Sequence, residues 1–328
     1  MENVLNKRQT RTFDLIVLIT LSALVILPSL GQTRYLTGHE IRHAEIIREM
    51  AESGDYLIPK LIGKVYVDKP PVMHAPAAIL TRIIGKPSMT IVRTPSAVAG
   101  ILGVLATYGI GLLLYNRRLA LLGAIVLLGI PGYNHMAREA RPDMVMCTAI
   151  LFSCFCLGLS MKRQKTAASV VYLSLAGMLA GVGLVTKGPY ALLVPTLFAI
   201  FATFRRQDFT RPRLGWIVFG LGIITTMALW AIPVYLRDGG VYLRGVIFQP
   251  DLDVGRGEGG RFYYYVLYGL LFTFPMSLFA PFNCRFMQAL VLIHAFHCRN
   301  YFYDYFMYSQ KTATLLAASL SVFCIRNR

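Results

Sequence analysis

The chain alternates between long apolar segments and short charged ones. A membrane-spanning helix needs roughly 20 mainly apolar residues, and eight segments approach or meet that length: 13–31, 92–115, 119–134, 144–161, 167–186, 189–204, 214–235 and 262–282. Basic residues precede the first segment, as in a signal peptide, but its apolar core is longer than such a peptide needs, which favours a retained anchor. The pattern predicts an all-α polytopic integral membrane protein.

The segment between the first two spans, residues 32–91, has a different pattern. Over residues 41–52 apolar side chains recur with helical spacing, and charged ones fall on the opposite face. The apolar face comprises Ile41, Ala44, Ile47, Met50 and Ala51, and the charged face Arg42, Glu45, Glu49 and Glu52. A second short helix is expected over 71–84, before Gly85 and Pro87. Both helices suit the membrane interface and the roof of a cavity; the alternative is a surface loop with two solvated helices.

Composition supports a membrane protein and charge orients it. The chain is 55% hydrophobic and 15% charged, with a net charge of +17, whereas soluble domains carry about 25% charged residues. Basic residues gather before the first span and between alternate pairs of later spans. They are Lys7, Arg8, Arg11, Arg117, Arg118, Lys162, Arg163, Lys165, Arg205, Arg206, Arg211 and Arg213. The positive-inside rule places these segments and the N-terminus in the cytoplasm, so the positive charge indicates topology and the lipid bilayer rather than nucleic acid as a partner.

The remaining loops then face outward: 32–91, 135–143, the turn at Lys187, and 236–261. The last contains Gly255, Gly257 and Gly260 in a GxGxxG spacing, but without the strand and helix that a dinucleotide-binding site requires. Its many glycines instead predict a mobile lid over 237–261.

Ionisable residues cluster on the outward side in three loops and one turn. They are His39, Glu40 and Arg42; Asp68 and Lys69; Arg138, Glu139, Arg141 and Asp143; and Lys187. Ionisable groups near a bilayer are costly and often mark functional pathways, although each one alone also fits an interfacial anchor. Carboxylates serve as bases or metal ligands, and lysine and arginine bind phosphates. Together they predict a polar site around one outward cavity.

The order of these residues resembles a known family. The residues that carry the resemblance are, in order, Glu40–Ile46, Met50, Ser53-Gly54-Asp55, Pro59, Gly63, Tyr66, Asp68-Lys69-Pro70-Pro71, the Asp143 segment, Thr186–Pro189, Tyr263–Tyr265 and Pro275. In these residues the chain resembles the bacterial polyprenyl-phosphate-sugar glycosyltransferases of the GT-C fold. This family includes lipid A aminoarabinose transferases and protein O-mannosyltransferase-like enzymes. The resemblance implies a GT-C-like transmembrane helix bundle over residues 1–283, with amphipathic interfacial helices in the first periplasmic loop.

The resemblance also implies an activity. The expected enzyme is a glycosyltransferase of the bacterial inner membrane that moves a sugar from polyprenyl phosphate, such as undecaprenyl phosphate, to lipid A, another envelope glycan or a protein at the periplasmic face. It implies Glu40 for base or positioning work, Asp68 for orientation or metal binding, and Asp143 as support. A divalent metal ion, held by Asp68 and Glu40, is an optional cofactor. Phosphate-binding and other substrate-binding roles fall to Arg42, Lys69, Arg141, Lys187 and Arg256.

Two features depart from the family. His39 stands where the family usually has a catalytic aspartate, so it is either a base or metal ligand or an inactivating change. Residues 284–328 differ in composition from the rest, and we interpret them as an atypical tail outside the ancestral reading frame of a truncated chain. The alternatives to an active transferase are an inactive remnant of one and a membrane transport protein. A transporter is expected to show two related halves with broken helices, and the sequence lacks that symmetry.

Overall fold

The computed structural model describes residues 2–32, 38–162, 167–205 and 212–248. The order of its elements is α1 (Glu2–Ile26), a 3-10 turn (Leu27–Ser29), α2 (Gly38–Ser53), β1 (Lys60–Leu61), β2 (Lys64–Val65), α3 (His74–Ile84), α4 (Met89–Leu114), α5 (Arg117–Gly129), α6 (Pro131–Arg138), α7 (Pro142–Lys162), α8 (Ala167–Lys187), α9 (Tyr190–Arg205), α10 (Pro212–Asp238) and α11 (Val241–Phe248). The expected span 262–282 and the tail 284–328 lie outside the described residues.

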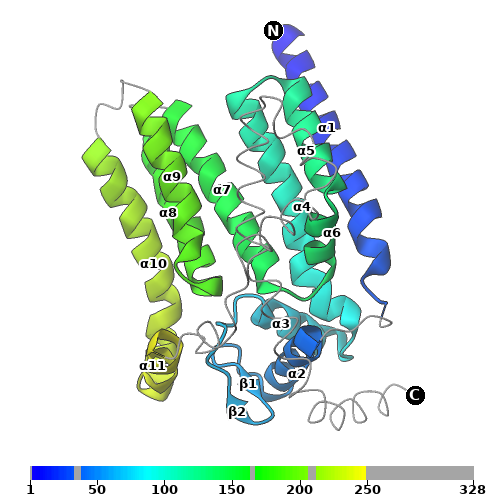
Figure 1. Cartoon of the computed structure of the whole chain (residues 1–328), viewed down its shortest axis with the longest axis vertical. Coiled ribbons are helices and arrows are strands. Elements are labelled where there is room, and N and C mark those ends of the chain that lie inside the picture. The colour runs from blue at the N-terminus through cyan, green and yellow to red at the C-terminus, as the bar shows by residue number, and fades with distance from the viewer. Residues whose placement is uncertain (1, 33–37, 163–166, 206–211, 249–328) are drawn as a thin grey trace, which may run out of the picture.

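The long helices stand side by side as a bundle (Figure 1). In the described part, five of them are long and apolar enough to cross a membrane, or six if α5 and α6 form one bent span. The apolar part of α9, Ala191–Ile200, is shorter. The chain is therefore a multi-pass, all-α membrane protein, as the hydropathy pattern predicts.

One predicted span is broken. Residues 119–134 were expected to form a single helix, but α5 ends at Gly129 and α6 continues at an angle of 65°. Pro131 is the first residue of α6; it has no N–H to donate, which suits a helix start and interrupts the helix before it. The Arg138 guanidinium, at the end of α6, donates to the carbonyl of Val25 in α1.

Close contact between α8 and α10 depends on small residues. A Cβ on Gly177 would collide with the backbone carbonyl of Phe219, and a Cβ on Gly222 would lie 2.5 Å from the carbonyl oxygen of Ser174. Small residues at membrane helix interfaces let the backbones approach. The Thr226 hydroxyl uses this proximity to donate to the Met178 carbonyl across the interface (3.0 Å).

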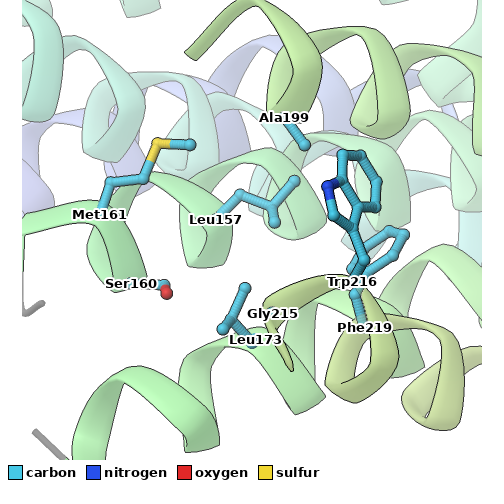
Figure 2. Close-up of a pocket in the computed structure, with 8 residues that line it drawn as sticks. All are labelled: Leu157, Ser160, Met161, Leu173, Ala199, Gly215, Trp216 and Phe219. Carbon is cyan, nitrogen blue, oxygen red and sulfur yellow. The ribbon is translucent and has the colours of Figure 1, made fainter. Parts of the chain in front are cut away.

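One end of the bundle, here called the polar end, is covered by the first loop and α11. The polar end carries α2, the β1–β2 hairpin, α3 and α11, on the opposite side from the N-terminus (Figure 1). Near the other end, a small cleft opens among α7–α10, lined by Leu157, Ser160, Met161, Leu173, Ala199, Gly215, Trp216 and Phe219 (Figure 2). Its lining contains no charged side chain, and the Ser160 hydroxyl already hydrogen-bonds Ser169 (2.9 Å). This cleft therefore offers no cation or carboxylate to stabilise a developing charge.

Candidate functional site

A small hairpin positions the residues that follow it. Lys60 pairs with Val65 and Leu61 with Lys64 in antiparallel register. Ile62 (φ 53°) and Gly63 (φ 71°) both have positive φ, as a tight type I′ turn requires. The Gly63 N–H also donates to the Glu49 carboxylate of α2 (3.2 Å). The hairpin is thereby anchored to α2 and delivers residues 66–69 to the polar end.

Asp68 is the centre of the site. The Tyr66 hydroxyl donates to its Oδ2 (2.8 Å) and the Lys69 ammonium to its Oδ1 (3.2 Å). The Arg42 guanidinium of α2 lies 3.9 Å from Oδ2. We call these four residues the Asp68 cluster. The Asp68 side chain is 27% exposed and that of Lys69 13%, so a ligand can reach the carboxylate and one of its cations.

The placement of Arg42 corrects one expectation. The helical pattern put Arg42 on the charged outer face of α2, yet the residue is 6% exposed. A buried guanidinium is stable only when paired, and Asp68 supplies a carboxylate on the inner side. The resulting cluster joins two loop segments that the resemblance had named separately.

The side chains beside the Asp68 cluster in α2 and α3 are aromatic and uncharged; we call His43 and His74 the histidine pair. His43 Nδ1 and His74 Nε2 lie 2.8 Å apart in a hydrogen bond between α2 and α3, and the rings of Tyr66 and His74 meet edge to face. Burial lowers the pKa of His74 to about 4, and burial together with the neighbouring His74 holds the pKa of His43 well below its usual value. Burial, reinforced by the Asp68 charge, raises the pKa of Tyr66 well above its usual value, which keeps its hydroxyl a donor.

Glu40 has a different environment from Asp68. It is fully buried, and both of its carboxylate oxygens accept from the Arg93 guanidinium (2.7 and 2.8 Å). The N–H of Ala140 donates to the same carboxylate (3.2 Å), and Arg93 also donates to the backbone carbonyls of Leu30 (2.9 Å) and Gln32 (2.7 Å). We call Glu40 and Arg93 the Glu40 clamp. The clamp ties α2 to the ends of α1 and α4 and to the α6–α7 connection, so the geometry favours positioning, one of the two roles the sequence left open for Glu40.

The other predicted residues form two further ion pairs. Lys187, at the end of α8, pairs with Asp143 at the start of α7. Arg141 pairs with Glu139 (2.6 Å), and its backbone N–H donates to the Ser96 hydroxyl (3.0 Å). The Lys187 pair joins α8 to α7, and the Arg141 backbone hydrogen bond joins the α6–α7 connection to α4. His39 is buried in the first turn of α2, and Arg256 lies outside the described residues.

Part of the expected lid is a helix. Residues 241–248 form α11, because Asp238 caps the helix start: its carboxylate accepts from the N–H groups of Gly240 (2.9 Å) and Tyr242 (2.6 Å). The rest of the expected lid, with Arg256, lies outside the described residues. A carboxylate ahead of a helix start is a capping signal, although two intervening glycines hide it.

The residues present do not form a ready metal site. Within the ranges that the structure describes, no three His, Cys, Asp or Glu side chains come together to hold a metal ion. Glu40 is paired with Arg93 and Asp68 with Lys69, so the two expected ligands are engaged by cations. The steps proposed below therefore use no metal.

Arg93 was missed by sequence reasoning, and so was α11. Arg93 stands near the start of an apolar segment, and its partner Glu40 is 53 residues away. A lone arginine in a span is itself a signal, because an intramembrane charge needs a partner.

Comparison with known proteins places the chain in a family. The family described as dolichyl-phosphate-mannose-protein mannosyltransferase matches residues 68–231, half of the chain. The chain belongs to this family. The match begins at Asp68, the centre of the site, and runs through the bundle into α10.

Relatives of the family share much of the chain. An undecaprenyl phosphate-α-4-amino-4-deoxy-L-arabinose arabinosyl transferase of Pectobacterium carotovorum is 28% identical over 81% of this chain and 48% of its own length. The transferase of the same name from Aeromonas hydrophila is 27% identical over 72% and 44%. The chain spans about half the length of the curated relatives it matches.

A solved structure shows the same fold. ArnT from Cupriavidus metallidurans bound to undecaprenyl phosphate has a TM-score of 0.67 and 21% sequence identity, covering 88% of this chain and 55% of that one. This chain thus has the GT-C membrane fold that the sequence resemblance implied.

Proposed function

We propose that the chain is a glycosyltransferase that moves a sugar from a polyprenyl phosphate to an envelope acceptor. The observation that carries the proposal is the Asp68 cluster, in which a partly exposed carboxylate and two cations meet at one end of a membrane bundle. Family membership and the names of the relatives support this class of reaction. A lipid-linked donor suits the site, because the bundle below it is surrounded by lipid.

The cations of the cluster suit the leaving group. When the acceptor oxygen forms its bond to the anomeric carbon, the bond from that carbon to the phosphate oxygen breaks and its electron pair goes to the phosphate. The developing negative charge is stabilised by cations placed beforehand. Lys69 and Arg42 are such cations, and they are held in place by Asp68.

Asp68 then orients the reactants. A hydroxyl acceptor has to lose its proton, and a carboxylate within hydrogen-bond reach can take it; a phosphate acceptor is already ionised and needs orientation alone. Tyr66 fixes the carboxylate by donating to one of its oxygens. The Glu40 clamp keeps α2, and therefore Arg42, at the correct height above the bundle.

The proposal includes a topology. Arg11, Arg117, Arg118 and Lys162 lie at the end of the bundle opposite the Asp68 cluster, and basic loops are typically cytoplasmic. The polar end then faces the periplasm of a bacterial inner membrane. Alkaline phosphatase fused after Gly85 is expected to be active and after Arg118 inactive; the reverse result overturns the topology.

The activity is tested with labelled sugar. Membrane vesicles with and without the chain receive undecaprenyl phosphate carrying labelled 4-amino-4-deoxy-L-arabinose or mannose, and label is counted in the lipid A, glycan and protein fractions. Wild type is expected to label one fraction, which identifies the acceptor, and Asp68→Asn is expected to lose that label. Glu52→Gln, an exposed carboxylate of the same loop, is the matched control and keeps it. The absence of transfer to every fraction contradicts the proposal, and EDTA in the same assay tests the expected metal.

A further inference from the structure

A second group of aromatic residues lies next to the Asp68 cluster. Tyr242 of α11 and Trp230 of α10 meet edge to face, with ring centroids 6.3 Å apart. They pack in an apolar cluster with Ile58 and Val67 of the first loop. Val67 directly precedes Asp68, so the two clusters are adjacent along the chain and in space.

The helix α11 packs closely against the first loop. A Cβ on Gly245 would lie 2.6 Å from Val67, so α11 rests directly on the residue before Asp68. In the last turn of α10, the Arg237 guanidinium lies 3.3 Å from the Asp55 carboxylate of the first loop. The end of α10 and α11 therefore form one wall packed against the first loop.

This wall contains two polar atoms that lack a hydrogen bond. Tyr242 is 1% exposed, and neither its hydroxyl nor the buried indole nitrogen of Trp230 has a partner among the described residues. Leaving a buried donor unsatisfied costs about 1–3 kcal/mol. Two such donors, carried by adjoining rings of two different helices, mark a place where the acceptors of a ligand would complete them.

The charges nearby select the chemistry of that ligand. Tyr242 is close enough to Asp68 and Asp238 for both carboxylates, after burial, to raise the pKa of its hydroxyl. The cations Lys69 and Arg42 pair with Asp68 instead. A phosphate therefore finds its cations at the Asp68 cluster rather than at Tyr242, whereas a neutral group rich in hydroxyl oxygens satisfies both donors and packs against the rings.

We infer that Tyr242 and Trp230 bind the sugar of the lipid-linked donor, through the phenol hydroxyl and the indole N–H, while Lys69 and Arg42 face its phosphate. This inference rests on the proposed function and assigns the sugar to the α10–α11 wall. The donor atoms are covered in this structure, so sugar binding requires α11 to move away from Val67. Gly239 and Gly240, which have positive φ, directly precede that helix. Tyr242 and Trp230 thereby become candidates for the residues that determine which sugar is accepted.

The test compares two lipids in detergent. Affinities are measured for undecaprenyl phosphate alone and for undecaprenyl phosphate-4-amino-4-deoxy-L-arabinose. Tyr242→Phe and Trp230→Phe are each expected to weaken binding of the sugar-bearing lipid about three- to tenfold, the effect of one hydrogen bond, and to leave affinity for the bare lipid within about twofold. Tyr235→Phe and Trp216→Phe, an exposed tyrosine of α10 and the tryptophan of the apolar cleft, are the matched controls and change neither value.

A spectroscopic readout separates ligand contact from structural support. The chain has two tryptophans, so Trp216→Phe leaves Trp230 as the sole indole. Its emission is expected to shift with the sugar-bearing lipid and to remain unchanged with undecaprenyl phosphate.

The outcomes distinguish the inference from the proposed function. If wild type binds neither lipid, the proposed function is contradicted. Suppose instead that wild type binds both lipids. If the two variants then keep their affinity for both lipids, or lose affinity for both equally, the sugar assignment is wrong while the proposed function stands.

Discussion

The two carboxylates of the first loop, Glu40 and Asp68, show how burial and partner geometry divide structural from chemical work. Glu40 is fully buried, and a single guanidinium occupies both of its oxygens. Asp68 is partly exposed and shares its charge among a tyrosine, a lysine and a more distant arginine. Glu40 is thus matched by a fixed partner, whereas Asp68 and its cations can exchange contacts with a ligand.

The largest expected effect comes from breaking the Glu40 clamp. Glu40→Ala leaves the Arg93 cation buried without its carboxylate, and such changes destabilise by about 3–5 kcal/mol. We expect a large fall in the unfolding midpoint, measured in detergent. The matched control is Glu45→Ala on the same helix, which removes a partly exposed pair with Arg48 and is expected to cost less than about 1 kcal/mol. Equal effects of the two variants would show that the clamp is not the structural centre of the loop.

Asp68 gives the opposite signature. Asp68→Asn keeps the shape of the side chain and removes its charge, so we expect kcat to fall about 100-fold or more, on the order of 3 kcal/mol in the barrier. The unfolding midpoint is expected to fall less than in Glu40→Ala, because Asp68 is partly exposed and its contact with the buried Arg42 is 3.9 Å long. A variant that unfolds while its remaining folded fraction stays active would reverse the assignment of the two carboxylates.

The buried His43–His74 pair predicts that the stability of the fold depends on pH. His74 has a folded-state pKa of about 4 and an unfolded value near 6.5. Between these values the unfolded chain binds a proton that the folded chain does not, so stability falls as the pH drops from 6.5 toward 4, by at most about 3 kcal/mol. Unfolding midpoints across this range measure the effect.

The matched variants use the same measurement. His74→Phe keeps an aromatic ring between α2 and α3 and is expected to flatten the dependence of the unfolding midpoint on pH. His135→Phe, which alters a histidine of α6, is expected to leave that pH dependence unchanged. A slope that survives in His74→Phe would assign it to His43 or to other groups.

Sequence patterns predicted the elements governed by local physics. The long spans followed from hydropathy, and α2 and α3 from helical periodicity, although α3 begins at His74 rather than at Pro71. The hairpin was missed because its strands have two residues each and Ile62 is a poor signal for positive φ. The eight-span total and the division at residue 283 stay predictions, because the last span and tail lie outside the described residues.

The partners of the charged residues were harder to predict than their positions. The sequence placed Asp68, Lys69 and Arg42 on one face of the membrane, and the structure brings them together. The sequence did not predict that Arg93 would pair with Glu40, or that Lys187 would pair with Asp143, since these contacts join residues 53 and 44 positions apart. Ion pairing at long range depends on how helices pack, which a pattern along one helix does not contain.

The smallest expected effect tests how tightly Asp68 is held. Tyr66→Phe removes the donor to Asp68 Oδ2 and keeps the ring against His74, so one hydrogen bond of about 1 kcal/mol is lost and kcat is expected to fall about three- to tenfold. Tyr56→Phe, on the same loop, is the control. Because Tyr66 acts through Asp68, its loss is expected to disappear in the Asp68→Asn background, where the double variant matches the single one. Additive losses in that cycle would mean that Tyr66 acts on the substrate directly, and would move it from positioning the carboxylate to binding the ligand.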